Sequence, residues 1–201
     1  MQNSLNLHRP TAIAAAIIML LDRAMDIGAS LSGMSPNIAW FMMEGQDLLI
    51  AVLLAVFLFR GKKDTAFGAA LMVSMLLLLL SMIWDFFSLV AGAATGYDRN
   101  LYFAYIGMSI LTTLFLAGFY CLTAVECLSQ GKISTGRERW LLWILPLIGF
   151  GCSFAENVLM GLYLGQSMED TVTGSILCVT LWWLGRGLMG VSFGMQKKTD
   201  V

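Results

Sequence analysis

Two carboxylates interrupt an apolar stretch of the chain that runs from Trp40 to Ala51. Glu44 and Asp47 are three residues apart, so on a helix they lie on the same face. A charged side chain in hydrocarbon costs at least ~2.5–3.5 kcal/mol. Carboxylates in such a segment therefore indicate a polar site that faces protein or water instead of lipid.

Four further acidic residues fall at a similar depth in other apolar segments: Asp22, Asp26, Asp85 and Glu156. Depth is counted at ~1.5 Å per residue from the segment ends that carry few basic residues. On this count Asp22 and Asp47 lie roughly 13–15 Å deep, and the other four acids lie roughly 9–11 Å deep. Polar residues share the faces of these acids, as Asn157 does beside Glu156. The six acids therefore predict a polar pocket in the outer half of a helix bundle.

The charge balance of this acidic layer indicates what would bind there. Arg23 and Arg186 are the two bases inside apolar segments, and we expect them to set the pKa values of the acids. Pairing with both would still leave about four carboxylates, and like charges at close range raise each other's pKa. A proton, a hard divalent cation such as Mg²⁺ or Ca²⁺, or a small cationic solute would balance them.

Within the layer, the depth of each acid suggests its role. The deepest acids, Asp22 and Asp47, would form the exchange site. An entry shell would comprise Glu44, Asp85 and Glu156. A purely structural network is the alternative, in which Arg23 pairs with Asp26 and Arg186 pairs with an acid of a neighbouring helix. Two such pairs would account for two acids and not for six.

Six apolar segments must position these residues. The predicted spans are residues 11–32, 38–59, 66–91, 101–128, 140–164 and 171–194. About 20 apolar residues cross a bilayer as a helix, and helices satisfy the backbone polar groups in lipid unless a barrel closes. The chain is 58% hydrophobic and 12% charged, about half the charged share of soluble domains. The sequence predicts an all-α membrane protein with a single transmembrane domain, residues 1–201, because no loop could hold a second domain.

The basic residues predict the orientation of this bundle. The outer loops carry Arg99 alone. The two tails and the inner loops carry Arg9, Arg60, Lys62, Lys63, Lys132, Arg137, Arg139, Lys197 and Lys198. Cytoplasmic loops of membrane proteins carry such an excess of basic residues. We therefore expect both termini in the cytoplasm and a multi-pass protein of the plasma membrane, specifically a bacterial inner membrane.

The first segment admits a second interpretation. Its purely apolar part, residues 11–21, is short for a bilayer, and Asp22, Arg23 and Asp26 follow it. A basic tail, a short apolar core and small residues also describe a secretory signal peptide. Against this, Asp22, Asp26 and Ser30 recur every four residues, as in a span whose polar seam faces protein.

Several classes of function are disfavoured by composition and motifs. A net charge of −1 argues against a nucleic-acid partner. The single histidine, His8, argues against the usual zinc and haem sites. The four cysteines lack paired spacing and indicate packing residues. No hydrolase or zinc-protease motif occurs, so no cofactor is identified, and the sequence favours a non-enzyme without deciding the question.

Small and aromatic residues predict close helix contacts. Gly187, Gly190 and Gly194 lie on one face of the sixth segment, a pattern typical of tightly packed membrane helices. The Ala12-x3-Ala16 patch of the first segment would pack within the bundle, or alternatively against a partner subunit or a second copy. The Trp182-Trp183 pair, one turn before Arg186, would pack in the core or form an aromatic wall for a cation.

These observations favour an integral membrane protein whose outward-facing acidic pocket binds, and moves, a proton, metal cation or small cationic solute. Two alternatives stay open. One is a substrate-capturing or accessory subunit of a membrane complex, by analogy of size and topology with the membrane-embedded binding subunit of a vitamin importer. The other is a metal-dependent lipid enzyme within the membrane, which would need its carboxylates close enough to share one ion.

Overall fold

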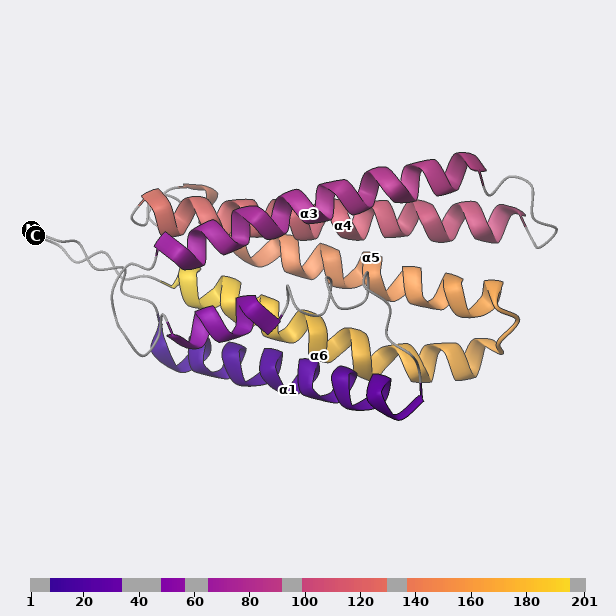
Figure 1. The fold of residues 1–201 in the computed structure, drawn as a ribbon, viewed down its shortest axis with the longest axis horizontal. Coiled ribbons are helices and arrows are strands. Elements are labelled where there is room, and N and C mark those ends of the chain that lie inside the picture. Colours follow the sequence, from indigo (N-terminus) through magenta and orange to yellow (C-terminus); the bar gives the residue numbers. More distant parts are fainter. Residues whose placement is uncertain (1–7, 34–47, 57–64, 92–98, 130–136, 196–201) are drawn as a thin grey trace, which may run out of the picture.

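The computed structural model describes residues 8–33, 48–56, 65–91, 99–129 and 137–195. Within these ranges the chain is helical and contains no strand (Figure 1). The described helices are α1 (Arg9–Gly33), a segment at residues 48–56, α3 (Thr65–Ala91), α4 (Arg99–Ser129), the short 3₁₀ helix η2 (Arg137–Trp140), α5 (Leu141–Tyr163) and α6 (Met168–Gly194). The all-α prediction is confirmed for this part of the chain.

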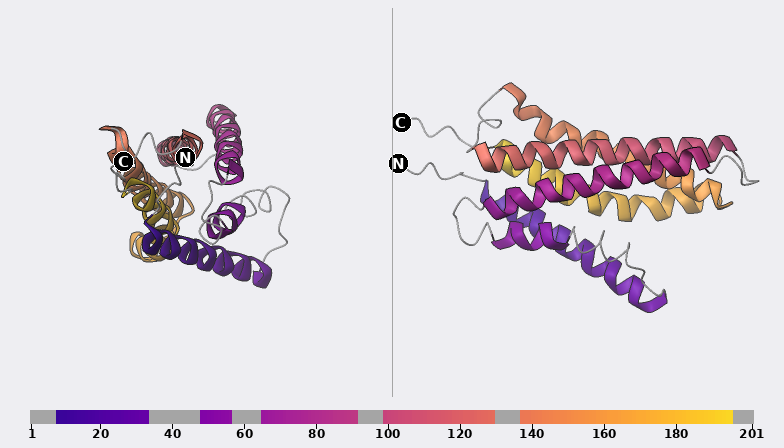
Figure 2. Two further views of the ribbon diagram at one scale, coloured as in Figure 1. Left: turned by 90° about the vertical axis from the view of Figure 1, so that its left-hand side faces the viewer. Right: turned by 45° about the horizontal axis from the view of Figure 1, so that its top comes forward.

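The helices pack side by side in an order that follows the sequence. α3 packs on α4, α4 on α5, α5 on α6, and α6 on α1. The helix at residues 48–56 lies between α1 and α3 (Figure 2). Its Ile50 and Leu54 are fully buried, and they join the same apolar core as Met19 of α1, Leu71 of α3 and Phe119 of α4.

The outer surface of the bundle is apolar. Large side chains are well exposed on α3 and α5, with Leu80 at 61%, Phe87 at 64% and Leu147 at 64%. Four helices are long and apolar enough to cross a membrane: α3 from Ala66 to Ile83, α4, α5 with most of η2, and α6. Exposed apolar side chains in such number suit lipid better than water. The four apolar helices are therefore consistent with a membrane protein.

α1 and the predicted second span are not among these four helices. α1 has 25 residues, but its charged residues Arg9, Asp22, Arg23 and Asp26 set it apart from the four apolar helices. Of the predicted span 38–59, the structure describes residues 48–56 as helix. The rest of that span lies outside the described residues.

The two ends of the described chain lie at one end of the bundle. The His8 backbone N–H donates to the Ser192 carbonyl oxygen at 3.2 Å, close to the end of α6. We call this the terminal end, and the opposite end, which contains Gly33, Ala91 and Tyr163, the distal end (Figure 1). The described chain therefore begins and ends on the same side of the bundle.

The start of α6 differs from the prediction. The predicted sixth span begins at residue 171, whereas α6 begins three residues earlier, at Met168. Ser167 caps the helix: its hydroxyl oxygen accepts a hydrogen bond from the Asp170 backbone N–H at 3.1 Å. Acidic residues in a first helical turn are also favoured by the helix dipole.

Glycines on α6 permit two close helix contacts. A Cβ atom on Gly190 would overlap the Leu142 carbonyl oxygen of α5, and one on Gly194 would overlap the Trp143 ring. A Cβ atom on Gly187 would have no atom of another described helix within 4 Å. The predicted tight face is therefore confirmed at Gly190 and Gly194 and is wrong at Gly187.

Candidate functional site

Three of the predicted acids lie six or seven residues before helix ends at the distal end of the bundle. Asp26 lies seven residues before the end of α1, Asp85 six before the end of α3, and Glu156 seven before the end of α5. All three helix ends belong to the distal end, whereas the side chains of Asp26 and Asp85 lie outside the described part. Glu44 and Asp47 lie outside the described residues altogether.

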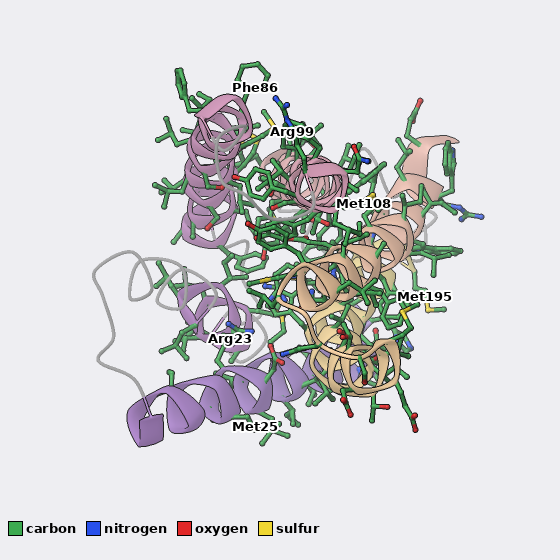
Figure 3. The ribbon with its side chains drawn as sticks, turned by 90° about the vertical axis from the view of Figure 1, so that its right-hand side faces the viewer. Arg23, Met25, Phe86, Arg99, Met108 and Met195 are labelled. Carbon is green, nitrogen blue, oxygen red and sulfur yellow. The ribbon has the colours of Figure 1, made fainter. Side chains whose placement is uncertain are left out.

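Asp22 and Arg23 form a buried ion pair on α1. Arg23 Nη2 donates to Asp22 Oδ2 at 2.6 Å, and Nε donates to the same oxygen at 3.2 Å. Both residues are buried, with 6% and 5% exposure. Figure 3 shows Arg23 on the side of α1 that faces the other helices, and Met25 pointing away from them. The described partner of Arg23 is therefore its sequence neighbour Asp22, whereas the Asp26 side chain of the alternative pairing lies outside the described part.

Glu156 and Asn157 lie on α5, whereas the Asp22–Arg23 pair lies on α1. Glu156 is half-buried and Asn157 is exposed, and the Asn157 amide nitrogen donates to the Ser153 carbonyl oxygen at 2.9 Å. α6 packs against both α5 and α1. Glu156 and Asp22 thus belong to helices on two sides of α6.

Among the described basic residues, Arg186 of α6 is the most deeply buried, with 1% exposure. Its Nε donates to the Tyr120 hydroxyl of α4 at 3.0 Å, and Nη1 donates to the Trp182 carbonyl oxygen at 2.8 Å. The guanidinium carbon lies 3.5 Å from the centre of the Trp182 ring. A cation in this position gains both charge-assisted hydrogen bonds and a cation–π contact.

The tryptophan pair therefore has two roles. Trp182 covers the resident cation Arg186, while Trp183 is buried with 2% exposure and packs against Gly149 of α5. The two rings meet edge to face, with centroids 4.9 Å apart. The aromatic wall and the core-packing interpretations each hold for one member of the pair.

Sequence reasoning missed the polar residues on the buried face of α4. Tyr120, Thr123 and Glu126 are all fully buried. The sequence placed Glu126 at the end of a span, where a carboxylate normally reaches water. The available signal was the three-residue spacing of Thr123 and Glu126 within an apolar helix, which puts both on one face.

The described side chains include no group of three His, Cys, Asp or Glu residues that could hold a metal ion. The cysteines with described side chains, Cys121, Cys127 and Cys152, are free thiols. What this arrangement can do chemically is hold charge away from lipid: Asp22 and Arg23 as a pair, and Arg186 on a phenol, a carbonyl and an indole face. Such buried ionisable groups are the usual components of ion and proton pathways.

Searches against protein-family models, curated proteins and solved structures find no match for this chain.

Proposed function

We propose that this protein is a six-span integral membrane protein that binds, and moves, a proton, a metal cation or a small cationic solute. The binding site is the acidic layer near the distal end, which faces outward. Both termini and the basic loops lie in the cytoplasm, and the membrane is the plasma membrane of a bacterium. Asp22 and Asp47 exchange the cation, while Glu44, Asp85 and Glu156 form the entry shell.

One observation carries this proposal, the buried Asp22–Arg23 pair inside a bundle whose exterior is apolar. Ionisable groups are costly inside a membrane protein, so they persist mainly where they form an ion or substrate pathway. The pair is buried on the side of α1 that faces the other helices, which supports a role for Asp22 in the acidic layer. Asp22 is therefore available to the interior of the bundle and not to lipid.

The charge distribution supports the orientation. Arg9 and Arg139 are exposed at the terminal end, and Glu169 and Asp170 are exposed at the distal end. The excess of basic residues on one side of a membrane protein marks its cytoplasmic side. Cysteine labelling of single-cysteine variants at positions 169 and 198 in intact cells tests this directly, because position 169 alone should react with an impermeant reagent added outside.

Transport is tested with purified protein in lipid vesicles, using protons, Mg²⁺ and methylammonium as separate probes. Wild-type protein should carry one of the three into the vesicles. Asp47→Asn should lower that uptake by about tenfold or more, since one lost charge contact of ~1.4 kcal/mol is already worth tenfold. Asp170→Asn, which removes an exposed acid at the distal end, is the matched control and should transport normally. Normal uptake by Asp47→Asn, or no uptake of any probe by wild type, would refute the proposal.

A further inference from the structure

A carboxylate outside the acidic layer lies in the core at the terminal half of the bundle. Glu126 has 0% exposure and lies three residues before the end of α4. α4 is one of the helices long and apolar enough to cross the membrane. Burying a carboxylate in such a helix costs several kcal/mol before compensation. Carboxylates buried in membrane helices commonly belong to ion or proton pathways, so Glu126 is a candidate for such a role outside the outer acidic layer.

Hydroxyl groups flank Glu126 on its own helix. Thr123 and Ser129 lie three residues on either side, so each of them lies next to Glu126 on the surface of α4. The Thr123 hydroxyl donates to the Phe119 carbonyl oxygen at 2.8 Å. The Ser129 hydroxyl oxygen is buried and has no hydrogen-bond partner among the described residues. A carboxylate with neighbouring hydroxyl oxygens is a suitable oxygen site for a proton or a hard cation.

The levels of the buried charges follow from the helix contacts. A Cβ atom on Gly185, next to Arg186, would lie 2.6 Å from Met19 Cγ, so Asp22 is roughly one turn closer to the distal end than Arg186. Arg186 bonds Tyr120 of α4, and Glu126 is roughly 9 Å closer to the terminal end than Tyr120. Arg186 therefore lies between Asp22 and Glu126 along the bundle axis.

We propose that Glu126 is a second cation-binding station, on the cytoplasmic side of Arg186. A proton or small cation leaves the outer acidic layer, passes the guanidinium held by Tyr120 and Trp182, and binds Glu126 before its release. Arg186 separates the two stations, because its fixed positive charge repels a cation that lingers between them. This inference rests on the proposed function and adds to it an inner site with its own residue.

Glu126→Gln tests the inner station against outer binding. Uptake is measured in lipid vesicles with protons, Mg²⁺ and methylammonium, and binding of the same probe is measured in detergent by intrinsic tryptophan fluorescence. Glu126→Gln should lower uptake by about tenfold or more, while binding at the outer layer stays within about twofold of wild type, a difference of only ~0.4 kcal/mol. Glu138→Gln, an exposed acid near the same end, is the matched control. Glu126→Asp, which keeps the carboxylate, should retain part of the uptake and shows that a loss in Glu126→Gln is not a folding defect.

The outcomes separate the two proposals. Wild-type uptake by Glu126→Gln, or equal losses in Glu126→Gln and Glu126→Asp, would overturn the inner station and leave the outer site standing. If wild type moves none of the probes, the proposed function itself fails. Loss of binding together with uptake in a well-folded Glu126→Gln protein would also overturn the inference, because it would place Glu126 in the outer site.

Discussion

The two sides of α6 are built in different ways. On the side that faces α1, Gly185 lies against the flexible side chain of Met19, and the charged pair of α1 is formed by sequence neighbours. On the side that faces α4 and α5, Gly190 lies against the Leu142 backbone carbonyl, and Arg186 bonds Tyr120, which is 66 residues away in sequence. The first contact is adjustable and local, and the second is rigid and depends on three helices.

This difference bears on how a cation could move through the bundle. The contact at Gly185 can open without separating Asp22 from Arg23, since both lie on α1. The His8–Ser192 backbone hydrogen bond would meanwhile hold the terminal end of α1 against α6. The contact among α4, α5 and α6 would have to break a buried hydrogen bond to open. We therefore expect α4, α5 and α6 to form a fixed unit, and α1 to be the helix that moves against it.

The largest effect should come from Arg186→Ala. This change removes the hydrogen bonds to Tyr120 and Trp182 and the contact with the indole ring, so it should lower the free energy of unfolding by about 3–4 kcal/mol. Arg99→Ala removes an exposed arginine that lies 5.6 Å from the Phe103 ring centre and should cost about 0.5 kcal/mol. Denaturant unfolding in detergent measures both. Equal losses of unfolding free energy in the two variants would show that the contacts of Arg186 stabilise the protein no more than the exposed Arg99–Phe103 contact does.

The glycine contacts test rigidity directly. Gly190→Ala forces a Cβ atom onto a backbone carbonyl, which cannot turn aside, and should cost about 2 kcal/mol. Gly185→Ala meets Cγ of the flexible Met19 side chain, so its cost should be lower, about 1 kcal/mol. Gly187→Ala meets nothing within 4 Å and should gain a few tenths of a kcal/mol up to ~1 from helix propensity. The thermal unfolding midpoints of the three variants give the order, and a reversed order for Gly185 and Gly190 would contradict the comparison.

The ion pair on α1 should show a smaller effect. Asp22→Asn keeps an oxygen acceptor but removes the charge opposite Arg23, so it should cost about 1–2 kcal/mol of unfolding free energy. The double variant Asp22→Asn with Arg23→Gln should recover part of this loss, because no uncompensated charge then stays buried. Additive losses in this cycle would mean that the two side chains do not stabilise each other.

Tyr120→Phe should have the smallest effect. It removes the hydroxyl that accepts the hydrogen bond from Arg186 and leaves the ring in place, which should cost about 1 kcal/mol. Tyr102→Phe, on the same helix and half-buried, provides a comparison for loss of a phenolic hydroxyl. Unfolding free energies in one detergent measure both variants, and a neutral Tyr120→Phe would show that the long-range hydrogen bond adds no stability.

The sequence alone determined the kind of protein and most of its elements. In lipid, apolar segments as long as residues 66–91 and 101–128 can satisfy their backbone hydrogen bonds as helices. Composition and length were therefore sufficient to predict these helices. Helix ends were less certain where local capping competes with composition, as at Ser167, whose hydroxyl starts α6 three residues before the predicted span. The levels of Asp26, Asp85 and Glu156 near one end followed from counting residues along helices of known rise.

Only the tertiary structure decided which of these groups meet. The sequence allowed Arg23 to pair with Asp22 or Asp26 along one helix, and the structure shows the pair with Asp22. The partnership of Arg186 with Tyr120 depends on how α4 and α6 face each other, which no local spacing encodes. Likewise Glu126 is buried because neighbouring helices cover the end of α4, whereas its sequence position near a basic loop favours an exposed side chain. Whether a polar group is buried depends on the packing of the whole bundle. The buried polar residues of α4 could therefore be identified as buried only from the fold.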